Sequence, residues 1–464
     1  MFRILSRLLP LLVWSAALAQ DDPDAVRKQA DELHGKKEYR KEIELLAKLL
    51  ERDPKDVSAL YNTACAYALL NRNREAVEFL TEAVEAGFSD FEHIQSDEDL
   101  ESIRKEEGYR KLLEGRSEKE RSAFEKRVKE YTDKLGGSYR TVRDEPRRTT
   151  VISDMAEDKF TMYVGILGNY QDYLHSTLFE HLPTYDLLVL IPNTPEDYQR
   201  KLGGRSGAAG FYTPATKTLT VNLKTGGGTM IHEWVHAMHF ADQAGHRQKH
   251  PIWIIEGLGS LYEQSAIFDG RPIGYTNWRL KGAQDAIQQK KMAPVKDFVQ
   301  NSDEYFRQNA GLSYAQTRYM FYWLQESRKL RKFYSLYVSG FSKDKTGLTA
   351  LEKVLGKKVD AWTNEWETFV LGLTFQGMGS TSLPRMGLEF EGIAGGLKIV
   401  DVDAKGAAAE AGVRKDDVLV KVEGKAVATL AAFHDQMEDK RQGEIVKLTV
   451  ERDGKRQDLK VKLK

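Results

Sequence analysis

The chain has 464 residues, of which 41% are hydrophobic and 30% are charged. This composition is ordinary for soluble globular domains and argues against a chain that is mostly membrane-embedded or disordered. The length exceeds that of one compact core and predicts about three domains. Lys and Arg together number 69, as do Asp and Glu, so the net charge gives no reason to expect nucleic acid as a partner.

Residues 1–19 have the pattern of a secretory signal peptide. Arg3 and Arg7 precede an apolar run, and the segment ends in small residues at Ala19. The run is shorter than the roughly 20 residues that cross a bilayer, so cleavage after Ala19 is expected rather than a membrane anchor. We therefore expect an exported chain, periplasmic or secreted, without a membrane span. Cys65 is the single cysteine, which excludes an intramolecular disulfide.

Residues 20–115 predict an all-α helical-repeat domain. Apolar residues recur at a separation of 34, namely Ala30 and Ala64, Ile43 and Val77, and Leu46 and Leu80. This period is the spacing of tetratricopeptide repeats, and the segment resembles two such repeats followed by an atypical third helix pair. Stacked helix pairs form a concave surface that can bind a protein partner. The alternative is a structural cap for the next domain.

Two further regions follow in chain order. Residues 116–145 are charge-rich and predict a solvated helix that ends in a glycine-rich domain boundary at Gly136. Residues 146–376 read as an α+β domain with mostly helical sequence. Its expected strands lie at 149–153, 186–191 and 218–223.

The segment from His232 to His236 predicts a metal site. Residues four apart share one face of a helix, so both imidazoles can reach one ion while Glu233 lies beside it as the base for a bound water. A catalytic zinc site needs a third protein ligand, and the residues offer Asp242 and Glu256. Position 239 is not the glycine of a longer histidine motif, so the helix is expected to continue and to carry Asp242 away from the ion.

Glu256 lies in the segment Trp253-Ile254-Ile255-Glu256-Gly257. Together with the histidine helix, this segment resembles the gluzincin clan of zinc metallopeptidases, particularly its aminopeptidase-like and peptidase MA-like members. The resemblance spans about 149–373, but only the two helices are specific. It implies a zincin-like metallopeptidase domain with one Zn²⁺ per chain, held by His232, His236 and Glu256.

The resemblance also implies a donor for the developing oxyanion, because gluzincins often supply a Tyr or His from a later helix. Tyr314 is the candidate, and Tyr319, Tyr262 and Tyr275 are its rivals. The chain has no Gly-Ala-Met-Glu-Asn segment of the kind that holds a substrate amino terminus, which favours an endopeptidase.

After a linker at 377–383, residues 384–464 predict a small β-rich domain with strands at 397–402, 418–422, 446–451 and 459–463. The segments Ala411-Gly412-Val413 and Asp416-Asp417-Val418-Leu419 resemble a PDZ domain of the kind found with bacterial proteases. The resemblance implies that a loop before the second strand binds a peptide C-terminal carboxylate, and Met386, Gly387 and Leu388 lie where this loop is expected. A spacer or a gate for the peptidase is the alternative role.

The sequence as a whole predicts an exported zinc metallopeptidase whose repeats and PDZ domain dock substrates or partners. The expected partners are a peptide or protein substrate, a possible protein on the repeat surface, and a peptide C-terminus at the PDZ domain. Two other hypotheses remain open. One is a non-catalytic scaffold with a structural or vestigial metal site, and the other is a zinc hydrolase whose substrate is not a peptide.

Overall fold

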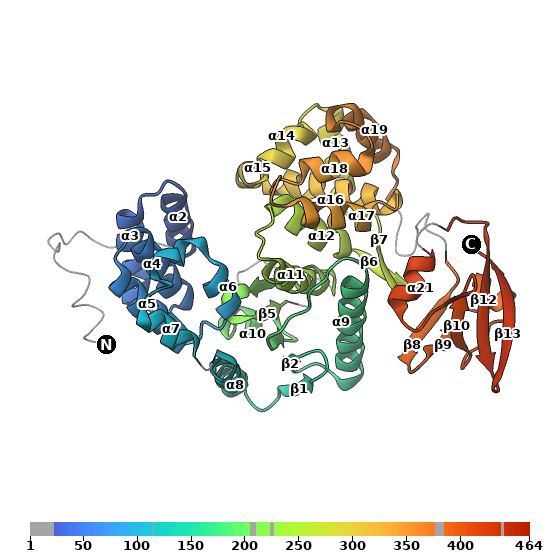
Figure 1. Ribbon diagram of the computed structural model, residues 1–464, viewed down its shortest axis with the longest axis horizontal. Helices are drawn as coiled ribbons and strands as arrows, with labels where there is room; N and C mark the ends of the chain where they lie inside the picture. The colour runs from blue at the N-terminus through green and yellow to red at the C-terminus, as the bar shows by residue number, and fades with distance from the viewer. Residues whose placement is uncertain (1–22, 115, 205–209, 223–226, 376–384, 438–439) are drawn as a thin grey trace.

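The computed structural model describes residues 23–114, 116–204, 210–222, 227–375, 385–437 and 440–464 (Figure 1). The predicted signal peptide, 1–19, and the predicted linker, 377–383, lie outside the described residues. Buried apolar side chains form separate clusters in the N-terminal helices, the central region and the C-terminal domain, so the chain is multidomain. No helix within the described ranges has the length and apolarity that a membrane crossing requires.

The N-terminal region is entirely helical. Its helices are α2 (Pro23–Gly35), α3 (Tyr39–Arg52), α4 (Val57–Leu69), α5 (Asn73–Ala86), α6 (Phe91–Ser96), the 3-10 helix η1 (Glu98–Ile103) and α7 (Glu107–Leu113). The second helix of each pair begins at Tyr39 and Asn73, so its start recurs after 34 residues. Gly87 closes α5 with a φ of +119°, a conformation that favours glycine. The third unit is shorter and irregular.

A five-stranded mixed sheet forms the first half of the central region, in the order β1-β2-β3-β5-β4. Its strands are β1 (Arg140–Asp144), β2 (Thr149–Ser153), β3 (Leu187–Ile191), β4 (Gly210–Thr213) and β5 (Thr218–Val221). The central strands pair in parallel, whereas β1 and β4 are antiparallel at the edges. Because side chains alternate along β3, Leu187 and Val189 belong to the core beneath the helices, and Leu188 and Leu190 face the opposite layer.

Helix α8 (Arg116–Leu135) supplies that opposite layer. Phe124, Val128 and Leu135 pack with Ile152 and Leu188 of the sheet. The sequence predicted this helix but interpreted it as a solvated linker, and that interpretation is wrong. Its few apolar residues form a narrow stripe that is buried against the sheet, while most of its charged residues face outward. Arg127 is the buried exception and donates a hydrogen bond to the carbonyl of Gly87.

The remaining elements of the central region are mainly helices. They are α9 (Glu157–Thr177), α10 (Pro195–Arg200), η2 (Pro214–Thr216), α11 (Gly227–His246), α12 (Ile252–Tyr262), β6 (Ser265–Phe268), β7 (Arg271–Gly274), α13 (Arg279–Gln288), α14 (Val295–Gln300), α15 (Ser302–Gln308), α16 (Ala310–Glu326), α17 (Leu330–Gly340), α18 (Leu348–Leu355) and α19 (Val359–Gly372). One buried cluster runs from Val151 of the sheet to Val370 of α19, so sheet and helices share a core.

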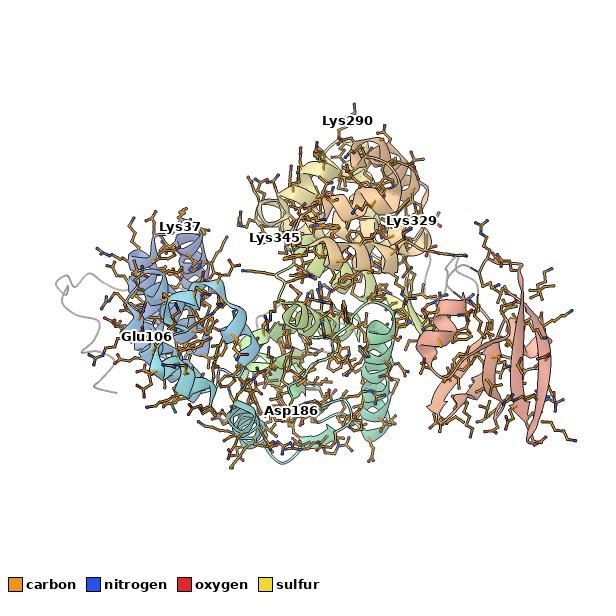
Figure 2. The ribbon with its side chains drawn as sticks, in the orientation of Figure 1. Lys37, Glu106, Asp186, Lys290, Lys329 and Lys345 are labelled. Atoms are coloured by element: carbon orange, nitrogen blue, oxygen red, sulfur yellow. The ribbon has the colours of Figure 1, made fainter. Side chains whose placement is uncertain are left out.

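The C-terminal region is a six-stranded antiparallel sheet with two short helices. Its elements are β8 (Leu388–Ile393), β9 (Gly396–Val402), α20 (Ala407–Glu410), β10 (Val418–Val422), β11 (Lys425–Ala426), α21 (Leu430–Met437), β12 (Ile445–Arg452) and β13 (Lys455–Lys462). The strand order β13-β12-β10-β9-β8 leaves β8 at an edge. Charged side chains surround all regions (Figure 2); for example, Lys37, Lys290 and Lys345 project from the surface at separate places.

A buried ion pair joins the N-terminal helices to the sheet. Lys217, just before β5, is 3% exposed and pairs with Asp90, the residue that caps α6. Burial alone raises the pKa of Asp90, but the lysine outweighs burial and lowers it. The backbone amide of Ser89 also donates to the carbonyl of Ala215, so two contacts connect these regions at one place.

Replacing Lys217 with Met leaves the carboxylate of Asp90 buried without its cation. We expect Lys217→Met to lower the free energy of unfolding by about 3–5 kcal/mol, because an uncompensated buried charge is strongly unfavourable. Denaturant unfolding measures this change. The double variant Lys217→Met/Asp90→Asn keeps a capping side chain without the charge and should recover most of the loss. Equal losses in both variants would contradict the role of the pair.

Candidate active site

Two helices bring the predicted metal ligands together. His232 and His236 lie one turn apart on α11, and Glu256 lies on α12. The Glu256 carboxylate oxygen Oε2 is 3.1 Å from Nε2 of His232 and 3.4 Å from Nε2 of His236. One donor atom from each residue lies within 4.8 Å of the other two. Two imidazole nitrogens and a carboxylate are the donor set of many zinc sites with an open position for water.

Glycines allow α12 to approach both of its neighbours. A Cβ atom added to Gly259 would lie 2.9 Å from Cε1 of His236 and 3.0 Å from Nε2 of His232, closer than side-chain contacts normally are. A Cβ atom on Gly257 would lie 2.3 Å from the ring of Phe321 in α16. The helix is therefore closely packed on both sides, and its imidazole-facing side has no room for a larger residue at Gly259.

The carboxylate of Glu256 is held in its charged form. Burial alone raises the pKa of Glu256, but the imidazoles of His236 and His232 outweigh burial and hold the pKa well below its ordinary value. The carboxylate is thus an anion enclosed by nitrogen ligands. Among residues 230–239 of α11, Glu233 is the one side chain that is not buried. Its carboxylate is therefore accessible from the cleft beside the donor set.

Glu263, at the C-terminal end of α12, contacts the Nδ1 side of the His232 imidazole. Its Oε2 lies 3.5 Å from Nδ1 of His232, and its Oε1 accepts hydrogen bonds from Asn277 at 2.8 Å and Arg279 at 2.9 Å. Burial raises the pKa of Glu263, but His232, Arg279 and Arg318 outweigh burial and lower it to about 2. Carboxylates in this position orient a histidine and make its other nitrogen a better ligand.

A cleft of about 960 Å³ runs along α11, and His232 is the member of the donor set that lines it. Its walls come from α9, β4, α11, the β6–β7 hairpin and α16, and they include Tyr163, Gly210, His232, Glu233, Ser265, Ala266, Ile267, Trp278 and Tyr314. Tyr314 lies with its ring 6.3 Å from that of His232. Burial and the nearby Glu256 raise the pKa of Tyr314 well above its ordinary value, so its hydroxyl stays a hydrogen-bond donor.

Asp242, the alternative metal ligand, lies apart from the donor set, and the alternative tyrosines to Tyr314 differ in their surroundings. Asp242 is fully buried and accepts hydrogen bonds from the amides of residues 180 and 181 and from Tyr334, away from the donor set. Tyr262 is buried, and the Tyr319 hydroxyl bonds to Asn277. Tyr262 and Tyr275 both line the same cleft as Tyr314.

The predicted carboxylate loop contacts a carboxylate of this chain. The backbone amides of Met386, Gly387 and Leu388 all donate to the side chain of Asp269, in the turn between β6 and β7. Sequence reasoning did not identify Asp269 or Glu263. Glu263 lies seven residues after Glu256, a spacing that puts both on one helix face and could have indicated it. The pair Asp269-Gly270 is a readable hairpin signal, but it does not reveal a partner 117 residues away.

Comparisons with known families match two parts of the chain. A PDZ domain model matches residues 384–463, so the chain carries a PDZ domain at its C-terminal end, as the sequence predicts. A family described as a protein of unknown function (DUF1570) matches residues 227–344. The second match contains α11, α12 and α16, and its description assigns no activity.

Two curated relatives match over short segments. The serine protease Do-like HtrA of Lactobacillus helveticus is 43% identical over 68 residues, which are 15% of this chain and 16% of that protein. A chloroplastic protein of Arabidopsis thaliana is 43% identical over 61 residues, which are 13% of this chain and 18% of that protein. The chain therefore spans less than a fifth of either relative.

Solved structures resemble the chain only distantly. An HtrA-type protease with a decapeptide is 18% identical, covers 18% of this chain and 30% of its own, and has a TM-score of 0.17. The serine endoprotease from Yersinia pestis is 19% identical, with coverages of 22% and 35% and a TM-score of 0.17. An aminopeptidase N family protein from Idiomarina loihiensis is 10% identical, with coverages of 70% and 66% and a TM-score of 0.26. Scores this low carry no inference.

The close approach at Gly259 generates a prediction. In Gly259→Ala the new methyl group must displace the two imidazoles, so we expect zinc affinity to fall about 10-fold or more, comparable to the loss of a ligand's supporting contact. Competition with a chelating dye measures the affinity. Gly282→Ala in α13 is the matched control, because no atom lies within 4 Å of its added Cβ. It should keep its zinc affinity, and unchanged affinity in Gly259→Ala would contradict the packing argument.

Proposed function

We propose that the chain is a zinc metallopeptidase that hydrolyses peptide bonds, with His232, His236 and Glu256 as ligands of one Zn²⁺. The observation that carries this proposal is the convergence of the three donors, within 4.8 Å, beside the cleft-facing carboxylate of Glu233. The contact of Glu263 with His232 supports it further, because a structure without a metal has no evident need for an oriented imidazole there.

A bound zinc ion would polarise the scissile carbonyl and lower the pKa of a bound water toward ~7. The residues of the chain then carry the proton transfers and hold the substrate. Glu233 takes the proton of the attacking water and passes it to the leaving amine. The Tyr314 hydroxyl, whose raised pKa keeps it protonated, donates a hydrogen bond to the oxygen that becomes negative.

Strand β4 offers a place for an extended substrate. It pairs with β5 on one side, and no other strand in the described part of the chain pairs with its second side. The strand passes close to the catalytic carboxylate, since the Cβ position of Gly210 lies 3.5 Å from Cγ of Glu233. A peptide added to this edge would align its backbone with the donor set.

The other modules have docking roles in this proposal. The PDZ domain binds peptide C-termini, and the N-terminal helices form a tetratricopeptide-like surface for a protein partner. The catalytic domain would extend over 116–376, since α8 covers the sheet. Export through the predicted signal peptide, 1–19, belongs to the same proposal. Within this proposal we favour cleavage inside a peptide chain, by an endopeptidase, over cleavage at its ends.

Glu233→Gln tests the catalytic role directly. We expect the variant to bind one zinc per chain like the natural protein, while its hydrolysis of a quenched peptide library falls about 10²–10⁴-fold, because the proton acceptor is lost. Glu304→Gln, at an exposed position on α15, is the control and should keep full activity. Chelation should remove the activity of the natural protein. Hydrolysis that survives both Glu233→Gln and chelation would show that another site is responsible.

A scaffold without catalysis gives a different result. In that case the zinc-loaded natural protein hydrolyses no peptide in the library, and Glu233→Gln changes neither zinc content nor peptide binding. The zinc stoichiometry of Glu256→Ala then still reports whether the donor set holds metal, since loss of the third ligand should release it.

A further inference from the structure

The carboxylate loop of the PDZ domain contains an internal ligand. The amides of Met386, Gly387 and Leu388 donate to the Asp269 carboxylate over 2.7, 2.8 and 2.8 Å. Gly387 has a φ of +80°, and this left-handed conformation accompanies the convergence of three successive amides on one anion. A PDZ domain receives the terminal carboxylate of a bound peptide with the same groups. Asp269 therefore stands where that carboxylate would bind.

The turn that carries Asp269 fits the end of the peptide groove. Asp269 and Gly270 join β6 to β7 with φ values of +50° and +69°, as a two-residue type I′ loop requires. A Cβ added to Gly270 would lie 2.8 Å from Leu430 of α21 and 3.7 Å from Phe390 of β8. Nε2 of His434 donates to the Asp269 carbonyl at 3.1 Å. The turn is thus enclosed between β8 and α21, and Asp269 is 8% exposed.

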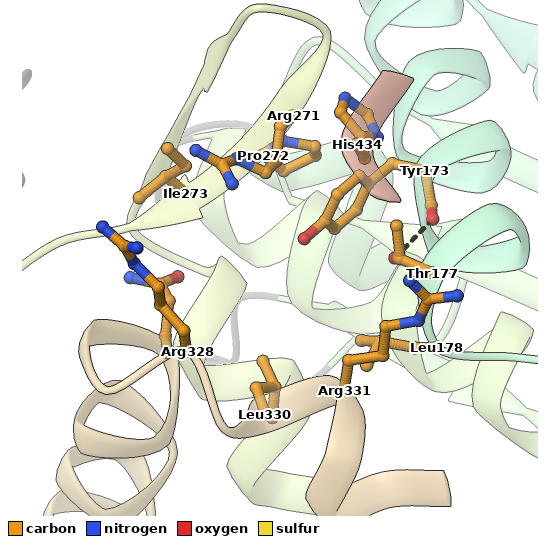
Figure 3. Close-up of a pocket in the computed structure, with 11 residues that line it drawn as sticks. Tyr173, Thr177, Leu178, Arg271, Pro272, Ile273, Arg328, Leu330, Arg331 and His434 are labelled. Carbon is orange, nitrogen blue, oxygen red and sulfur yellow. Dashed lines mark hydrogen bonds between the residues drawn. The ribbon is translucent and has the colours of Figure 1, made fainter. Parts of the chain in front are cut away.

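Other contacts surround this turn. The ring of His434 lies 5.4 Å from that of Tyr173 in α9, and both line a cavity of about 70 Å³ together with Arg271 of β7 (Figure 3). Arg331 of α17 pairs with Asp435 of α21. The PDZ domain is therefore docked against the central region at the hairpin, with α9 and α17 beside it. Only the hairpin turn enters the carboxylate loop in the described residues.

The same hairpin forms part of the cleft wall. Ser265, Ala266 and Ile267 of β6 line the cleft together with His232 and Glu233. Within the described residues, β6 and β7 pair only with each other and not with either larger sheet. A two-stranded hairpin has little stability of its own, so its position depends on its contacts with other elements. These include the hydrogen bonds of Gly274 with Gln325 of α16 at its base and those of Asp269 with the carboxylate loop at its tip. Releasing the tip would loosen the cleft wall.

We propose that Asp269 occupies the PDZ site as an internal ligand, and that a peptide with a free C-terminal carboxylate and an apolar last side chain binds by displacing it. The three amides donate to one carboxylate at a time, so the two ligands exclude each other. Only molecules with a free loop can bind a peptide. The measured affinity therefore equals the affinity of the free loop multiplied by the fraction of molecules in which the loop is free. Displacement releases the β6–β7 hairpin, and the effect of this release on hydrolysis rests on the proposed function.

Peptide binding by the full chain tests the competition. The probes are fluorescein-labelled decapeptides that end in Val, Leu or Phe, each made with a free carboxylate and with a C-terminal amide. Asp269→Gly removes the internal carboxylate and keeps a turn sequence suited to positive φ. Asp453→Gly is the matched control, because Asp453-Gly454 forms the same kind of turn between β12 and β13 at an exposed position.

We expect Asp269→Gly to bind at least one carboxylate probe about 10- to 100-fold more tightly than the natural chain, since its loop is always free. Asp453→Gly should bind like the natural chain, and amide probes should bind to none. Thermal unfolding of each variant checks that the fold is retained. Equal affinities of Asp269→Gly and the natural chain, or no carboxylate-dependent binding by Asp269→Gly, would overturn the proposal.

Hydrogen exchange tests the release without relying on catalysis. Saturating carboxylate probe should speed amide exchange over residues 265–274 in the natural chain, and Asp269→Gly should exchange faster there without the probe. Unchanged exchange in both cases would contradict release of the hairpin. Hydrolysis of an internal quenched peptide, with and without the probe, then reports the effect on the cleft. If no variant hydrolyses peptide, the proposed function fails while the binding and exchange results still decide the competition.

Discussion

The close packing of α11 against α12 is the constraint on which the candidate site depends. Gly259 brings the backbone of α12 against the two imidazoles, and Gly257 brings its other side against α16. The donor atoms are therefore fixed by three packed helices rather than by loops. A site held in this way has little freedom to rearrange, which suits a function that needs fixed distances between its groups.

Helical periodicity predicted part of this site. The four-residue spacing of His232 and His236 puts both on one face without any knowledge of the fold, and the apolar flanking residues indicate burial. Glu256 came only from a resemblance, because nothing local says that a second helix returns to the first. Glu263 was missed because its role depends on where α12 ends and on Arg279, which the sequence does not position.

Element bounds were easier to predict than element packing. The strand at 149–153 has the predicted bounds, and the helix before Gly136 ends at the predicted residue, Leu135. The burial of that helix was not predicted, because its charge dominates the composition. Its apolar stripe is narrow and consists of Phe124, Val128 and Leu135 with the partly buried Tyr131. The PDZ domain was recognised from turn sequences. Its contact with Asp269 joins distant segments, and no local preference encodes such a pair.

The short edge of β4 limits what the backbone can contribute to selectivity. The four described residues of β4 span ~13 Å, which is enough for only a few main-chain hydrogen bonds. Proline follows the strand directly, so the edge does not continue beyond Thr213. Because an edge with few hydrogen bonds binds a peptide weakly, a second binding site on another module would raise the overall affinity. The first contact increases the effective concentration of the peptide at the second. If the proposed function holds, substrates would be selected by avidity across the modules of the chain rather than by side-chain pockets beside the donor set.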